Sequence, residues 1–91
     1  MQLEGRVALV TGASSGVGAA TAVSLAREGA LVALAARRVE RLLAVAVDIE
    51  QLGGQAHVIQ TDLRDTKQVT NMVKQAVARW GRLDILVNNA G

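Results

Sequence analysis

The sequence predicts an α/β fold built on part of a doubly wound parallel sheet. Short apolar runs that suit buried strands alternate with stretches in which apolar residues recur at helical spacing. The connections between them are short, and this β-α-β-α-β-α-β order favours parallel strands, right-handed crossovers and helices on both faces. We therefore expect strand order 3-2-1-4, with the sheet truncated after its fourth strand.

The expected strands are runs rich in Val, Leu, Ala and Ile that lie at residues 6–11, 31–36, 56–61 and 85–87. The first three show little polar alternation, which is typical of strands buried on both faces of a parallel sheet. The fourth would form an open edge, because no fifth strand follows it within the 91 residues. We expect residues 1–91 to be a single, incomplete domain.

Three helices are expected between these strands. The first spans about residues 16–28, with Ala20, Ser24 and Leu25 on its inner side. The second carries Val39, Leu42, Leu43, Ala46 and Ile49 near helical spacing and ends at the glycine pair 53–54. The third begins with residues 65–68, which have the form of a capping box, and its apolar side chains are Val69, Met72, Val73, Ala76, Val77 and Trp80.

Composition excludes several classes of function. The chain is 51% hydrophobic and 20% charged, which is too apolar for a disordered segment. Trp80 is the one residue among Phe, Trp and Tyr, so the chain cannot form a stacking surface for nucleic-acid bases. Its arginines are scattered along the sequence, and we therefore expect no nucleic-acid partner. The longest apolar stretch, 29–36, is far shorter than the roughly 20 residues that span a bilayer, and residues 1–6 do not resemble a signal peptide. With no cysteine for thiolate ligands, we expect a cytoplasmic protein without a metal site or a membrane partner.

A glycine-rich turn lies where the first strand meets the first helix. Gly12, Gly16 and Gly18 have the spacing G-x-x-x-G-x-G. At such a junction the N–H groups and the positive end of the helix dipole stabilise an anionic phosphate, provided that the side chains are small. Taken alone the turn is a weak signal, and the alternative is an ordinary tight strand–helix connection.

Two other phosphate or nucleophile motifs do not fit this turn. Residues 12–16 also match G-x-S-x-G, the nucleophile turn of α/β-hydrolases, whose triad runs serine, acid, histidine. Here the one histidine is His57, and the carboxylates that most closely precede it, Asp48 and Glu50, lie on the expected second helix. A G-x-x-x-x-G-K phosphate loop is excluded because the first lysine is Lys67.

Three features in order resemble the short-chain dehydrogenase/reductase family: the glycine turn, Asp62 after the third strand, and the run Asn-Asn-Ala-Gly at 88–91 after the fourth. The resemblance covers almost the whole chain and implies a partial Rossmann domain that binds a dinucleotide cofactor. It implies that residues of the turn hold the pyrophosphate and ribose, namely Gly12, Ser14, Ser15, Gly16, Val17 and Gly18. It also implies that Asp62 and Leu63 contact adenine and that Asn89, Ala90 and Gly91 line the nicotinamide-side ribose, whereas Asn88 is structural.

The end of the second strand indicates which dinucleotide is bound. Enzymes that use NAD place Asp or Glu there to bind the ribose 2′-hydroxyl, but this chain has Ala36 followed by Arg37 and Arg38. Two guanidinium groups would bind a 2′-phosphate through charge-assisted bonds, so we expect NADP(H) in preference to NAD(H). The alternative is that both arginines simply begin the second helix in solvent.

The resemblance also implies a Ser-Tyr-Lys catalytic site, which these 91 residues cannot supply because they contain no tyrosine. We expect the chain to bind cofactor and to be inactive by itself. The complete protein would be an NADP(H)-dependent homo-oligomer that transfers hydride to or from a small-molecule alcohol or carbonyl substrate. The alternative is a stand-alone nucleotide-binding module without catalysis.

Overall fold

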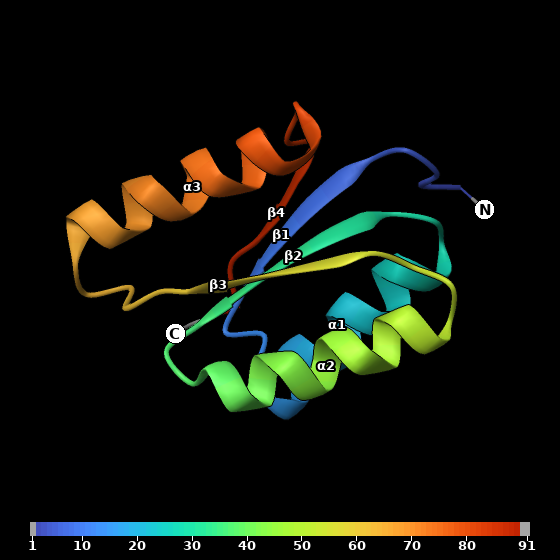
Figure 1. The fold of residues 1–91 in the computed structure, drawn as a ribbon, viewed down its shortest axis with the longest axis horizontal. Helices are drawn as coiled ribbons and strands as arrows, with labels where there is room; N and C mark the ends of the chain where they lie inside the picture. The colour runs from blue at the N-terminus through green and yellow to red at the C-terminus, as the bar shows by residue number, and fades with distance from the viewer. Residues whose placement is uncertain (1, 90–91) are drawn as a thin grey trace.

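The computed structural model describes residues 2–89 as three layers, with one sheet between two layers of helices (Figure 1). The strands are β1 (Val7–Thr11), β2 (Leu31–Ala36), β3 (Ala56–Gln60) and β4 (Ile85–Val87). The helices are α1 (Gly16–Arg27), α2 (Val39–Gln51) and α3 (Thr66–Trp80). Helices α1 and α2 cover one face of the sheet and α3 covers the other (Figure 1).

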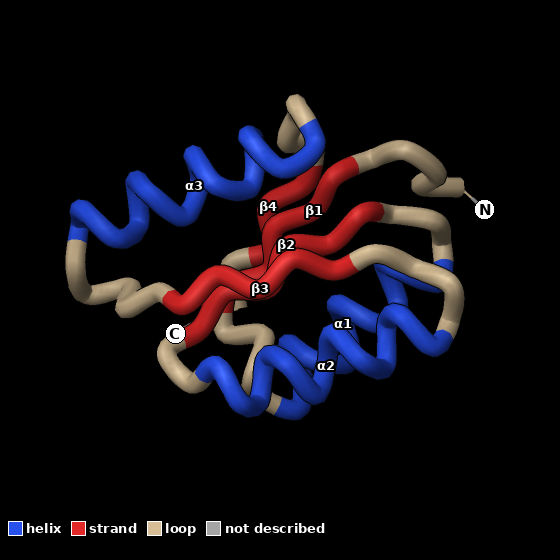
Figure 2. Tube along the Cα trace, viewed as in Figure 1, coloured by secondary structure: helices blue, strands red, loops and turns tan. Residues whose placement is uncertain are grey.

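The sheet has the predicted order β3-β2-β1-β4, and every pair of neighbouring strands is parallel. Figure 2 shows the four strands side by side between the helices. Val10 lies opposite Leu34 of β2 and opposite Val87 of β4. Strand β1 therefore has neighbours on both sides, and all five of its residues are buried. This position explains why its sequence is continuously apolar up to Thr11.

Successive side chains of β2 point into two different cores. Val32 and Leu34 pack in the core beneath α1 and α2, where Leu42 and Ile49 are also completely buried. Ala33 and Ala35 face α3 and pack in a smaller core that includes the residues Leu9, Ile59, Met72 and Ala76. Burying apolar side chains on both faces of one strand stabilises the sheet by roughly 25 cal/mol for each Å² removed from water.

The inner face of α1 differs from the predicted one. Gly18, Ala22 and Ala26 are buried against the sheet, whereas Ala20 and Ser24 are exposed. The helix consists mainly of small residues on all sides, so apolar spacing alone does not select one face. In α2, likewise, Leu43 is 52% exposed and Val45 is buried in its place.

Only half of the predicted capping box forms at the start of α3. Asp65 caps the helix as expected, because its side chain accepts hydrogen bonds from the backbone N–H groups of Lys67 and Gln68. The Gln68 side chain does not return to the Asp65 N–H, which instead donates to the Asp62 carbonyl at 3.0 Å. Gln68 accepts a hydrogen bond from the Asp62 N–H at 2.8 Å, and so fixes the loop before the helix.

Strand β4 is fixed at its start by one carboxylate. The Val7 N–H donates to Asp84 Oδ2 at 2.8 Å, and the Asp84 N–H donates to the Val7 carbonyl at 2.9 Å. The Arg82 guanidinium donates to both carboxylate oxygens of Asp84, at 2.9 and 2.8 Å. These bonds from Arg82, and then the bond from Val7, lower the pKa of Asp84 below its usual value of 3.8. Farther along β4, Leu86 is 58% exposed on the face that α3 covers elsewhere.

The turn between β1 and α1 depends on an unusually close approach. Gly12 has φ +63°, a conformation that side chains rarely adopt, and it turns the chain from strand to helix. A Cβ on Gly18 would clash with the Gly12 carbonyl oxygen and would lie 2.8 Å from Asn89 Nδ2. A Cβ on Gly16 would meet no atom within 4 Å.

We expect Gly18→Ala to lower the free energy of unfolding by about 1–3 kcal/mol, because the first turn of α1 must move away from β1. Gly16→Ala is the matched control and should change it by less than about 0.5 kcal/mol. Urea denaturation of both variants measures the difference. Equal stabilities would contradict the close approach.

We expect acidification to destabilise the chain through Asp84. Its pKa is lower in the folded state than its usual value, so its stabilisation is complete above that value and is lost as pH falls through the folded pKa. The urea midpoint should fall as the pH is lowered through and below that usual value, and it should fall less in Asp84→Asn, which cannot titrate there. An unchanged pH dependence in that variant would show that other carboxylates are responsible.

Candidate dinucleotide-binding site

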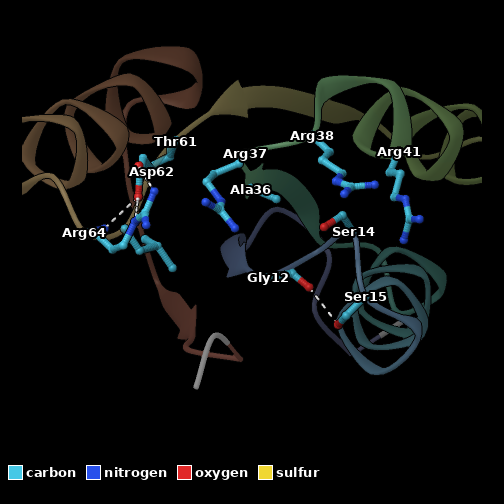
Figure 3. A pocket seen from close by; sticks show the side chains of 11 residues that line it. Gly12, Ser14, Ser15, Ala36, Arg37, Arg38, Arg41, Thr61, Asp62 and Arg64 are labelled. Carbon is cyan, nitrogen blue, oxygen red and sulfur yellow. Dashed lines mark hydrogen bonds and ion pairs between the residues drawn. The ribbon is translucent and has the colours of Figure 1, made fainter.

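The carboxyl ends of β1, β2 and β3 surround a cavity of about 680 Å³ (Figure 3). Seven of the residues predicted for the site line it: Gly12, Ser14, Ser15, Arg37, Arg38, Asp62 and Leu63. Gly16, Val17, Gly18 and Asn89 lie beside it on α1 or after β4, whereas Ala90 and Gly91 lie outside the described residues. The cavity lies outside the carboxyl ends of the strands, which is the edge at which doubly wound sheets bind ligands.

The hydroxyl of Ser15 organises the turn. It donates to the Gly12 carbonyl at 2.9 Å and accepts from the Gly18 N–H at 3.1 Å, which makes Ser15 the N-cap of α1. The side-chain amide of Asn89 also donates to it, at 3.3 Å. The Ser15 side chain is therefore used within the protein, whereas Figure 3 shows Ser14 on the side of the cavity from which Arg38 projects.

The first N–H groups of α1 are available to an anion. Gly16 and Val17 are the first two residues of the helix, so their N–H groups have no acceptor within it. Among residues 2–89 neither group donates a backbone hydrogen bond outside the helix, and Val17 is 70% exposed. With open space at the Gly16 Cα, this end of α1 fits a phosphate group.

Three exposed arginines at the end of β2 and the start of α2 form what we call the basic rim, which consists of Arg37, Arg38 and Arg41. Figure 3 shows Arg38 and Arg41 on one side of the cavity and Arg37 nearer its centre. The ion pairs found among residues 2–89 all involve other arginines. The rim therefore presents positive charge to the cavity without a carboxylate partner in the described part of the chain. Arg41 was not predicted, although its position in the first turn of the second helix, four residues after Arg37, is a usable signal.

Asp62, on the opposite side of the cavity, is bound by Arg64. Asp62 Oδ1 accepts hydrogen bonds from the Arg64 N–H at 3.0 Å and from Arg64 Nε at 3.1 Å, and Asp62 Oδ2 accepts from a terminal nitrogen of Arg64 at 2.9 Å. The side-chain bonds from Arg64 are the main reason that the pKa of Asp62 falls to about 2. This ion pair was not predicted, although the spacing Asp-x-Arg is a usable signal for it.

Thr11 joins the ends of β1 and β4. Its hydroxyl lies 3.2 Å from Asn88 Oδ1 and 3.3 Å from the Val87 carbonyl oxygen, either of which can accept its proton, and it accepts from the Asn89 N–H at 3.1 Å. Asn88 thus has the structural position that was expected. This role of Thr11 was not predicted, although its place as the single polar residue of β1 was an available signal.

His57 lies on β3, away from the cavity. Its ring packs edge-on against Trp80 with centroids 6.2 Å apart, and burial, followed by the charge of Arg79, lowers its pKa. Within residues 2–89, no helix has the length and apolar character needed to cross a membrane.

Comparisons with known proteins agree with the fold and identify the family. A family model described as short chain dehydrogenase matches residues 6–91. The chain is 51% identical over 89 residues to a glycine betaine reductase of Emericella nidulans, covering 98% of this chain and 7% of that protein. It is 47% identical over 90 residues to a 7alpha-hydroxysteroid dehydrogenase of Clostridium sardiniense, covering 99% of this chain and 34% of that protein.

Solved structures show the same similarity. The chain superposes on a metagenomic short-chain oxidoreductase in complex with NADP with a TM-score of 0.95 at 46% identity, covering all of this chain and 41% of the other. It also superposes on a hydroxysteroid dehydrogenase from Escherichia coli with a TM-score of 0.95 at 36% identity, covering 99% of this chain and 38% of the other. From its glycine turn to its strand order, the chain belongs to the short-chain dehydrogenase family.

Proposed function

We propose that this chain is the cofactor-binding part of an NADP(H)-dependent oxidoreductase that transfers hydride between the nicotinamide and an alcohol or carbonyl compound. Membership of the family supports the reaction class, and one solved relative is in complex with NADP. The observation that carries the preference for NADP(H) is the basic rim, which stands where enzymes that use NAD place a carboxylate.

The parts of the cofactor would bind along the carboxyl edge of the sheet. Its pyrophosphate would lie at the start of α1, against the N–H groups of Gly16 and Val17, with Gly12 and Gly18 shaping the turn. The 2′-phosphate would contact the basic rim and the Ser14 hydroxyl, which line the same cavity.

The two ends of the dinucleotide would lie on either side of that turn. Adenine would lie near Leu63, with its amino group donating to the Asp62 carboxylate. The nicotinamide-side ribose would lie near Asn89, which the Thr11 hydroxyl and Ser15 fix beside the turn. The proposed contacts at Ala90 and Gly91 fall outside the described residues.

The bound cofactor would supply hydride transfer at its nicotinamide ring. The chain has no tyrosine to exchange a proton with a substrate oxygen, so we propose that it binds cofactor without catalysing the reaction alone. It spans 34% of the hydroxysteroid dehydrogenase and 41% of the NADP complex. We accordingly propose that residues 1–91 form an incomplete NAD(P)-binding domain and that the complete enzyme is a homo-oligomer.

We expect Arg37→Asp to weaken binding of NADP⁺ by about tenfold or more, because it removes a charge-assisted bond to the 2′-phosphate and adds repulsion. Binding of NAD⁺, which lacks that phosphate, should change little. Calorimetric titration of both dinucleotides into both proteins measures the two affinities.

Lys74→Asp is the control for this experiment, since it makes the same change in net charge at an exposed position on α3. It should leave both affinities unchanged. An equal loss of NADP⁺ and NAD⁺ binding in Arg37→Asp would refute the assignment of the 2′-phosphate to the basic rim.

A further inference from the structure

Two of the charged residues that line the cavity, Asp62 and Arg64, form an ion pair with each other. Three hydrogen bonds join the two residues, and the guanidinium meets the carboxylate at two points, which fixes the plane of the carboxylate. The Arg64 side chain is nevertheless 78% exposed, so it packs little against the protein. Its main contact is with Asp62.

The backbone of Asp62 is fixed as well. Its N–H donates to Gln68 Oε1 at 2.8 Å, and its carbonyl accepts from the Asp65 N–H at 3.0 Å. The preceding residue, Thr61, donates its N–H to the Ala36 carbonyl at 2.9 Å, which continues the pairing of β3 with β2. Both the position of Asp62 and the direction of its carboxylate are therefore set before any ligand arrives.

The hydrogen bonds leave a defined acceptor capacity. A carboxylate oxygen accepts about two hydrogen bonds, and an ionised carboxylate donates none. Asp62 Oδ1 already accepts two from Arg64, whereas Oδ2 accepts one. Oδ2 can therefore accept one further hydrogen bond.

We propose that Arg64 is a positioning residue that makes Asp62 a single-acceptor site selective for a purine with a 6-amino group. This inference rests on the proposed function, because it needs the adenine end of the dinucleotide at Asp62. Adenine presents an amino donor at position 6, which matches one acceptor. Hypoxanthine presents an oxygen there, and two acceptors facing each other repel. The Asp62 carboxylate is ionised at neutral pH, and its lowered pKa makes protonation to accommodate that oxygen still more costly.

The test compares NADP⁺ with the same dinucleotide carrying hypoxanthine, by calorimetric titration of the 91-residue chain. The unsubstituted chain should prefer adenine by about tenfold or more. In Arg64→Ala the Asp62 carboxylate can rotate away from the position that suits the adenine amino group. The preference for adenine should therefore fall to about threefold or less, and the affinity for NADP⁺ should change more than the affinity for the hypoxanthine dinucleotide. Arg64→Lys keeps the charge but not the planar two-point contact, and it should also lose most of the preference.

Arg82→Ala is the matched control. Arg82 binds Asp84 at the same sequence separation and also through two bonds, but it does so at the starting edge of the sheet, opposite the cavity. This variant should keep the adenine preference. Equal loss of both dinucleotides in Arg64→Ala, or an unchanged preference in Arg64→Ala and Arg64→Lys, would overturn the proposal.

A second measurement separates this proposal from the proposed function. Carbon-13 NMR titration of the Asp62 carboxyl in the ligand-free chain should give a pKa near 2, and in Arg64→Ala it should rise toward the usual 3.8. If that shift is seen and the unsubstituted chain binds neither dinucleotide, the pair is real but the proposed function fails. If the dinucleotides bind and the pKa of Asp62 does not change in Arg64→Ala, the positioning role fails alone.

Discussion

The contact between Gly18 and the Gly12 carbonyl sets the geometry of the carboxyl edge of the sheet. Because no Cβ stands between them, α1 begins directly beside the end of β1 rather than one side chain away. That placement brings the first N–H groups of α1 to the edge where Thr11 ties β4 to β1. The same approach lets Asn89 reach the Ser15 hydroxyl. This close approach therefore brings the end of β1, the start of α1 and the loop after β4 into contact with one another.

Charges are used differently at the two edges of the sheet. At the starting edge, Arg82 and Asp84 pair with each other, and Asp84 also binds the backbone of Val7, so the charges hold β4 in place. At the carboxyl edge, Arg64 binds the Asp62 carboxylate. The arginines of the basic rim therefore have no carboxylate partner among residues 2–89. Two ion pairs of similar geometry therefore have different consequences. One completes the fold, and the other leaves net positive charge in a cavity that would suit a phosphate.

The sequence predicted the strands and their order because each strand is an apolar run in a chain with short connections, which physically restricts the topology to few choices. It also placed the glycine turn, Arg37 and Asp62 at one edge, since parallel strands end on the same side. It failed on the inner face of α1, whose small residues lack amphipathic contrast, so that packing against the sheet decides which side is buried. It missed Arg64 because the partner of a flexible side chain depends on the local turn. It predicted a complete capping box, of which one half does not form because the Gln68 side chain accepts from the Asp62 N–H instead of the Asp65 N–H.

The proposed function depends on a pyrophosphate lying against backbone N–H groups at the start of α1. The most direct test follows the backbone amide signals of the ¹⁵N-labelled chain during titration with NADP⁺. We expect the largest shifts at Gly12 to Gly18, smaller ones at Arg37 and Asp62, and almost none on the exposed face of α3 around Lys74. Saturable binding that leaves the signals of Gly12 to Gly18 unmoved would contradict the account.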